Sequence, residues 1–384
     1  MRPGAELESA RPIRIAVVTG SRAEFGLLTS VMHAITADPS LKLIVFAANS
    51  HLIQPALTLR DVKALFPIAD SVPMQLAGRI GRNEDAQAVG TGISRFARVF
   101  ASHNPDWVVV LGDRIEAFAA AAAANIGGFL LAHIHGGDRA EGVADEAMRH
   151  AITKLSHMHF PATKTSADRI IRMGERAEKV HIVGSPAIDE LAAVEAMNDE
   201  LFTEIGSPKV LFLMHPVGRH AEMEEAVATE VLAACKAAGS VLALAPNHDP
   251  GRDGIFRVLR ECQGIRVIEH LPRPKFVSLL KRLAAAGGVM VGNSSAALIE
   301  AAALKVPAVN VGHRQLGRER AGNVVDAADE TQGGVALAIA AAKNLDRSIL
   351  THPYGAGQAG SAIARILAAT SLAEPGLRRK LNAY

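Results

Sequence analysis

The chain has 384 residues, 49% of them apolar and 21% charged, with a formal net charge of +2. This length is more than one hydrophobic core usually organises, so we expect two domains. The small net charge, two Tyr and one Trp give no basic run interleaved with aromatic residues, and we expect no nucleic-acid partner. Without a signal-peptide core or an apolar run of about 18 residues, a cytoplasmic protein outside the membrane is expected.

Short apolar runs alternate with helix-like stretches through the first half of the chain. This alternation is typical of βαβ units that build a parallel sheet. The predicted strands are residues 13–19, 41–47, 107–111, 129–134 and 180–183.

A second set of the same kind follows a helix-like stretch over 187–205, which ends at Gly206, Ser207 and Pro208. Its predicted strands are residues 210–214, 241–245, 265–268, 289–291 and 308–311, and its helices include 221–239 and 273–287. The fold class is therefore α/β, with Rossmann-like domains over 1–187 and 188–360 and a last helix over about 361–384 that packs back on the first domain. Open parallel sheets bind ligands at the carboxyl ends of their strands, so we expect the site in a shared cleft.

The first motif, TGSRAEFG, comes directly after the first predicted strand and carries Arg22 at the start of a helix. Free N–H groups at a helix start and a guanidinium both favour a phosphate. A plain βα turn with a solvated Arg is the alternative at equal odds.

Asp113 follows Gly112 at the end of an apolar strand. A carboxylate there is either a helix N-cap or a catalytic or ribose-binding group.

The next strand reads LLAHIHGGD, and strand alternation places His133 and His135 on one face. Two glycines follow, which would let a ligand approach the backbone. The helix after them carries Asp145 and Arg149 near its start, and their spacing of four also suits a surface ion pair.

Five His lie between residues 133 and 159, yet no HExxH motif occurs, His157 and His159 are expected on a strand, and no metal centre is expected. A histidine that acts as acid or base is the more credible role, because its ordinary pKa suits proton transfer near neutrality. Cys235 and Cys262 show no metal-ligand or disulfide pattern.

In the second half, His215 and Asn247 each follow a predicted strand, where ordinary turn chemistry is the alternative. The segment VMVGNSSAALIEAAA then ends a strand and opens a helix at Ser294 and Ser295, with Glu300 further along that helix. A diphosphate could accept from the hydroxyls and the helix N-terminus, and Glu300 could accept from ribose hydroxyls. One Ser as a plain N-cap is the alternative.

Arg314 and Arg318 follow the next predicted strand in GHRQLGRER, where their charges would counter a phosphate.

In this order, GSRAEFG, LGDR, HIHGGD, DEAMRHAITKLSHMHF, HP, GNSSAALIEA and GHRQLGRERAGNVVD resemble the UDP-N-acetylglucosamine 2-epimerase family, in particular the hydrolysing branch that makes sialic-acid-type sugars. The resemblance implies a GT-B architecture with the active site between the domains, and a homodimer. It implies elimination of the nucleoside diphosphate to a glycal, followed by addition of water, without metal or nicotinamide cofactor.

The resemblance also implies roles for individual residues. Asp113 and Asp145 match acid/base carboxylates, whereas the nucleotide and its diphosphate are matched by Arg22, His215, Ser294, Ser295, Glu300 and Arg314. Asn247, in a loop that departs from the family pattern at His248, is a further candidate for reading the base or the sugar.

One departure concerns the catalytic centre, because His135 stands where well-known members carry a catalytic Glu. Asp138 follows the two glycines at a different position. Imidazole can carry a proton at neutral pH but supplies no negative charge. The alternatives therefore stay open: the same reaction on a GDP- or diamino-sugar nucleotide, a GT-B glycosyltransferase, or a sugar-nucleotide binder without turnover.

Overall fold

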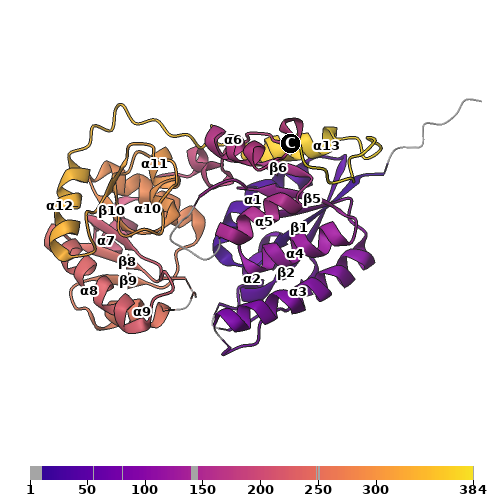
Figure 1. Cartoon of the computed structure of the whole chain (residues 1–384). Helices are drawn as coiled ribbons and strands as arrows, with labels where there is room; N and C mark the ends of the chain where they lie inside the picture. The colour runs from indigo at the N-terminus through magenta and orange to yellow at the C-terminus, as the bar shows by residue number, and fades with distance from the viewer. Residues whose placement is uncertain are drawn as a thin grey trace, which may run out of the picture.

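The computed structural model describes residues 11–54, 56–79, 81–139, 146–247, 249 and 251–383. It contains two six-stranded parallel sheets with the strand orders β3-β2-β1-β4-β5-β6 and β12-β11-β10-β7-β8-β9. Each is the doubly wound order in which the chain starts at the centre of the sheet and builds outward on both sides. The predicted α/β class is confirmed, and the two sheets form two lobes side by side (Figure 1).

The first sheet is built from residues before the first crossing between the lobes. Its strands are β1 (Ile13–Thr19), β2 (Leu41–Ala48), β3 (Ile68–Val72), β4 (Trp107–Leu111), β5 (Leu130–Ile134) and β6 (Met158–Phe160). Its helices are α1 (Arg22–Ala37), α2 (Leu59–Leu65), α3 (Arg82–His103), α4 (Ile115–Ile126), α5 (Glu146–Leu155) and α6 (Lys164–Arg172).

The second sheet repeats this plan. Its strands are β7 (Val210–Leu213), β8 (Val241–Leu244), β9 (Arg266–Ile268), β10 (Val289–Gly292), β11 (Ala308–Asn310) and β12 (Val324–Asp326). Its helices are α7 (Asp199–Glu204), α8 (Ala221–Ala238), α9 (Arg252–Glu261), α10 (Arg273–Ala285), α11 (Glu300–Ala303) and α12 (Gln332–Lys343).

Apolar side chains cover both faces of each sheet, as expected for strands that read as almost continuous hydrophobic runs. On the first sheet, α1 packs on one face and the Ala-rich α4 on the other. On the second sheet, α10 packs on one face and α8 on the other. Because helices cover both faces of each sheet, a ligand can reach the sheets at the carboxyl ends of their strands.

The last helix, α13 (Ala359–Ala369), lies on the first lobe, where it packs against α1 (Figure 1). Gly360 makes this contact close, because a Cβ there would lie 2.7 Å from the backbone of Ser30. The chain thus crosses between the lobes twice.

Several predicted elements are wrong. Residues 180–183 form no strand, and Val180 makes only an isolated bridge to His159 at the edge of the sheet. The expected helix over 187–205 is instead two 3-10 turns, η3 (Pro186–Ile188) and η4 (Leu191–Ala193), followed by the short α7. Ala187, Ile188 and Leu191 pack into the core of the second sheet, whereas Ala192, Ala193 and Ala196 are exposed. The strands β3 and β12 were not predicted, whereas the expected strand at His157 and His159 is confirmed as β6, which begins at Met158.

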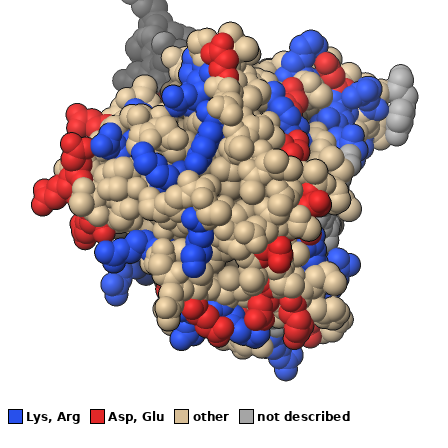
Figure 2. Space-filling view, turned by 90° about the vertical axis from the view of Figure 1, so that its left-hand side faces the viewer, with Lys and Arg blue, Asp and Glu red and all other residues tan. Residues whose placement is uncertain are grey.

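The outer end of the second lobe carries acidic and basic side chains in small mixed groups around a wide neutral area (Figure 2). This distribution agrees with the small net charge of the chain. None of the helices that the structure describes is long and apolar enough to span a membrane.

Candidate active site between the two sheets

The predicted site residues gather at the points where the strand order of each sheet reverses. In the first sheet, β1 and β4 are neighbours, and Gly20 and Asp113 follow them. In the second sheet, β7 and β10 are neighbours, and His215 and Asn293 follow them. Such switch points are where doubly wound sheets bind ligands.

The carboxyl ends of the strands in the second sheet, here called the second-sheet edge, carry His215 and Asn293. Hydrogen bonds join the Asn293 side chain to the backbone of His215. The Asn293 side chain accepts from the His215 N–H at 2.7 Å and donates to the His215 carbonyl oxygen at 2.8 Å. The Nδ1 of His215 accepts from the Asn247 N–H at 3.1 Å, which fixes the tautomer with its proton on Nε2. Burial and the charge of Arg314 lower the pKa of His215 to about 3, so the ring is a neutral hydrogen-bond donor.

The predicted helix through Ser294, Ser295 and Glu300 is wrong in detail. Ser294 caps a 3-10 turn, η5 (Ser295–Ala297), and accepts from the Ala296 N–H at 3.3 Å, so its capping role is confirmed. A further turn separates η5 from α11, which begins at Glu300. The buried Glu300 carboxylate accepts from Arg273 at 3.2 Å. The segment therefore offers hydroxyls and turn N–H groups, without the dipole of a long helix.

Arg314 lies beside this turn. Its guanidinium donates to the Asn293 carbonyl oxygen at 3.2 Å, and Gln315 donates to the same oxygen at 2.9 Å. His215 and Arg314 thus both bind Asn293, and the three residues form a single hydrogen-bonded unit.

At the first-sheet edge, Arg22 opens α1 and pairs with Asp61 of α2 at 3.1 Å. The glycine before this helix is required by Glu116, because a Cβ on Gly20 would lie 2.1 Å from that side chain. Glu116 also accepts from Arg114 at 2.9 Å, and Arg114 reaches across to Asp249 of the second lobe at 3.6 Å.

Asp113 forms an ion pair with Arg149, whose side chain is buried. It is not the cap of the following helix, because Arg114 occupies that position in α4. Arg149 also donates to the Asp138 carbonyl oxygen at 3.0 Å, so one guanidinium joins the two aspartates. Asp145 lies outside the described residues.

His135 follows β5 and has a left-handed backbone with φ of +62°, so strand alternation does not set its direction. Its Nδ1 lies 2.9 Å from Asp138 and its Nε2 lies 2.9 Å from the Ser185 hydroxyl. His133 instead contacts Thr153 and the Gly112 carbonyl oxygen. Both nitrogens of His135 are therefore engaged within the protein.

The two glycines after His135 serve packing, whereas the sequence suggested approach by a ligand. A Cβ on Gly136 would lie 2.8 Å from the His133 ring. Gly137 has φ of +76°, and a Cβ there would lie 2.4 Å from the Ser166 carbonyl oxygen. The glycines allow α6 to come close enough for the Ser166 hydroxyl to donate to Asp138 at 2.8 Å.

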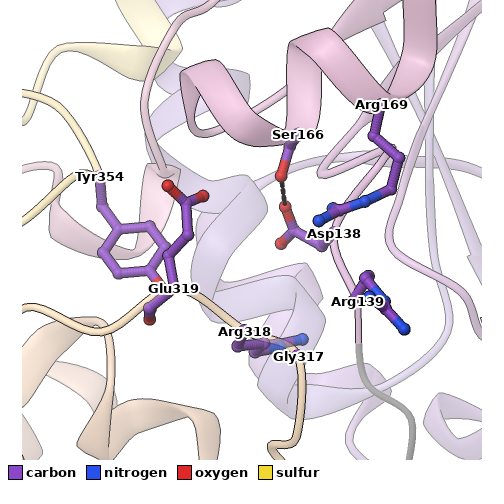
Figure 3. A pocket seen from close by; sticks show the side chains of 8 residues that line it. All are labelled: Asp138, Arg139, Ser166, Arg169, Gly317, Arg318, Glu319 and Tyr354. Carbon is purple, nitrogen blue, oxygen red and sulfur yellow. Dashed lines mark hydrogen bonds between the residues drawn. The ribbon is translucent and has the colours of Figure 1, made fainter. Parts of the chain in front are cut away.

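A pocket opens next to Asp138, between segments that belong to the two lobes (Figure 3). From the first lobe, Asp138, Arg139 and Arg169 line it, and from the second lobe Arg318 reaches it. Asp138 and Glu319 bring negative charge among these guanidiniums. The lining set is Asp138, Arg139, Ser166, Arg169, Gly317, Arg318, Glu319 and Tyr354.

The charges around this pocket are coupled. Burial raises the pKa of Asp138, but His135, Arg318 and Ser166 outweigh it and hold that pKa below its ordinary value. Burial, together with Arg318, Arg169 and Arg314, lowers the pKa of Arg149 to about 9. The positive charge around the pocket thus keeps the Asp138 carboxylate ionised.

The sequence did not indicate Ser166, Arg169, Ser185 or Tyr354 as site residues. Ser166, Arg169 and Tyr354 follow no predicted strand, and Ser185 follows the predicted strand over 180–183 that does not form. Each reaches the site through a contact that the fold creates. Among the described residues, no group of three or more His, Cys, Asp or Glu is placed to hold a metal ion.

Comparison with known proteins identifies the family to which the chain is similar. The model of the UDP-N-acetylglucosamine 2-epimerase family matches residues 33–368. A UDP-N,N'-diacetylbacillosamine 2-epimerase (hydrolyzing) from Legionella pneumophila is 36% identical, over 97% of this chain and 99% of that protein. A UDP-N-acetylglucosamine 2-epimerase from Neisseria meningitidis is 30% identical, over 83% of this chain and 85% of that protein.

Among solved structures, a Methanocaldococcus jannaschii UDP-GlcNAc 2-epimerase in complex with UDP-GlcNAc and UDP matches with a TM-score of 0.77. The match has 19% identity and covers 92% of this chain and 99% of that one. This likeness confirms the predicted GT-B type of architecture.

Proposed function

Since the chain belongs to the UDP-N-acetylglucosamine 2-epimerase family and is an enzyme of sugar-nucleotide chemistry, we propose that it is a hydrolysing 2-epimerase. Its substrate in this proposal is the UDP derivative of a 2-acetamido sugar. The products are UDP and the free 2-epimeric sugar.

One observation carries this proposal. Arg149 binds the Asp113 carboxylate and the Asp138 backbone, beside a pocket lined by segments of both lobes. Arg149 holds the Asp113 carboxylate, whereas His135 and Ser166 hold the Asp138 carboxylate. Two carboxylates fixed in this way can divide the work of proton removal and proton delivery. The cationic side chains around them oppose the negative charge of a departing diphosphate.

The reaction has two balanced steps. A base removes the proton from C2 while the C1–O bond to the diphosphate breaks, which leaves a C1–C2 double bond and releases UDP. Water then adds across this bond, with hydroxyl to C1 and a proton to the opposite face of C2. We assign the proton transfers to Asp113 and Asp138 together with Asp145, and His135 orients Asp138.

The second-sheet edge holds the nucleotide in this proposal. His215 donates from Nε2 to a phosphate oxygen, Arg314 supplies positive charge, and Ser294 and Ser295 donate hydroxyls. Glu300 accepts from the ribose, and Arg22 approaches the diphosphate from the first lobe. Asn247 supports His215 through its backbone N–H.

For the sugar, UDP-N,N'-diacetylbacillosamine is the first substrate to test beside UDP-N-acetylglucosamine. The Legionella pneumophila relative named for that substrate is more similar than the Neisseria meningitidis one and matches nearly the full length of both chains. A cytoplasmic homodimer that needs no metal or cofactor completes the proposal.

The experiment is incubation with UDP-N,N'-diacetylbacillosamine, UDP-N-acetylglucosamine and a panel of GDP and CMP sugars in deuterium oxide. We expect UDP and a free sugar that carries deuterium at C2, with no acceptor present. A requirement for an acceptor would instead indicate a GT-B glycosyltransferase. Binding without turnover of any of these substrates would overturn the proposal.

A further inference from the structure

Both connections between the lobes meet at Ser185. Val183 packs on the core of the first sheet, whereas Ala187 and Ile188 belong to the core of the second, so the chain passes between the lobes at residues 184–186. The return connection leaves the second core at Tyr354 and joins the first core at Ile363.

The two connections are in direct contact. The Ser185 N–H donates to the Tyr354 carbonyl oxygen at 2.9 Å. Gly184 makes room for this approach, because a Cβ there would lie 2.7 Å from the same oxygen and 3.1 Å from Gly355. Asp189 ties the connections a second time by accepting from the N–H groups of Ala359 at 2.9 Å and Gly360 at 2.7 Å.

The Ser185 hydroxyl points from this junction to the reaction centre. It is fully buried, accepts from the Ala187 N–H at 3.1 Å and lies 2.9 Å from His135 Nε2. His135 in turn lies 2.9 Å from Asp138, which lines the pocket between the lobes. A continuous row of hydrogen bonds thus runs from the junction to the carboxylate.

A hydroxyl suits this position because it can both donate and accept. With Asp138 ionised, His135 donates to it from Nδ1. Ser185 can then donate to an unprotonated Nε2 or accept from a protonated one, so the ring keeps its orientation in either state.

We propose that Ser185 is a positioning residue that orients the His135–Asp138 pair from the junction of the two interlobe connections. The hydrogen bonds from Ser185 through His135 then fix the orientation of Asp138 toward the sugar. This inference rests on the proposed function, since it assigns Asp138 to the reaction.

The first test is Ser185→Ala, assayed for turnover of the UDP sugar that the wild type accepts. We expect kcat to fall at least about tenfold, because a misdirected acid/base group loses part of its usual contribution. KM and the UDP-induced rise in Tm should match the wild type, because the second-sheet edge is intact. Ser185→Thr, which keeps the hydroxyl, should retain most of the wild-type kcat.

The matched control is Asp189→Asn. It weakens the same junction without touching His135, so it should lower Tm while leaving kcat near that of the wild type. If Ser185→Ala does not fold, Ser185→Cys keeps nearly the same volume with a weak hydrogen-bonding group and should show the same loss of kcat.

A double-mutant cycle separates positioning from plain stability. In His135→Asn the amide keeps a donor for Asp138 but cannot reach Ser185, and Asn tolerates the left-handed backbone. If Ser185 acts through His135, adding Ser185→Ala to His135→Asn costs no further kcat. An equal loss in both backgrounds, or wild-type kcat in Ser185→Ala, would overturn the inference. Absence of turnover in the wild type would instead overturn the proposed function.

Discussion

The two sheets share one strand order, yet their carboxyl edges are built from different interactions. At the second-sheet edge, the side chains of His215 and Asn293 form hydrogen bonds with backbone N–H and C=O groups of His215 and Asn247. At the first-sheet edge, ionisable side chains hold one another in pairs, such as Asp113 with Arg149 and Asp138 with His135.

Under the proposed function, this difference separates binding from chemistry. Hydrogen bonds between side chains and backbone keep the second edge in one geometry and leave the neutral His215 ring able to donate to an anion. Paired charges at the first edge set protonation states, which proton transfer requires. Variants of the first edge should therefore change kcat, and variants of the second edge should change nucleotide affinity.

The largest effect is expected from Asp138→Asn. The amide keeps the size of the side chain but removes its charge and basicity, so kcat should fall by about 10²- to 10⁴-fold. UDP affinity, measured by calorimetry, should stay the same. The control is Asp168→Asn, which breaks only an exposed pair with Lys164 on α6. Turnover of Asp138→Asn close to that of the control would contradict the proposed division.

A smaller effect is expected from Arg314→Ala. Loss of one charge-assisted hydrogen bond of about 1.5–3 kcal/mol should weaken UDP binding about 10- to 100-fold. At saturating substrate, kcat should decrease much less than in Asp138→Asn. Arg347→Ala removes an exposed guanidinium that donates to Ala284 and is the matched control. A loss confined to kcat, with unchanged UDP affinity, would place Arg314 at the reaction centre instead.

The last effect is expected on stability at the first edge, where no change in turnover is needed to detect it. Burial and the nearby Glu116 raise the pKa of Glu24 to about 8, and its carboxyl accepts from the Gly20 N–H at 2.9 Å. The folded protein keeps this proton up to a pH of about 8, while the unfolded chain releases it above the ordinary Glu pKa of 4.5. The Glu24 contribution to the free energy of unfolding therefore falls as pH rises from that value to about 8, by at most about 1.4 kcal/mol per unit.

Glu24→Gln stays neutral and should show a smaller loss of stability between pH 5.5 and 7.5 in urea unfolding. The exposed Glu222→Gln on α8 should follow the wild type. Identical pH profiles for Glu24→Gln and the wild type would show that Glu24 is ionised in the folded protein.

Much of the fold could be predicted because strand and helix periodicity are local properties of the sequence. The apolar strands β1, β4 and β7 were found, and with them the residues that follow each strand. The strands β3 and β12 were missed, because β3 alternates partly buried and exposed side chains before Val72 and β12 has no fully buried residue. The segment 187–205 has helix-forming composition, yet its buried residues Ala187, Ile188 and Leu191 reach the second core from 3-10 turns.

The sequence by itself determined the two doubly wound sheets and the candidate residues Asp113, His215 and Ser294, because each depends on a strand and the turn after it. Only the tertiary structure decided which groups meet. His135 and Ser185 are 50 positions apart, and Asp138 and Arg318 come from different lobes. Hydrogen bonds and charge interactions act over a few ångströms in space, and chain order does not encode such distances until the two sheets are packed together.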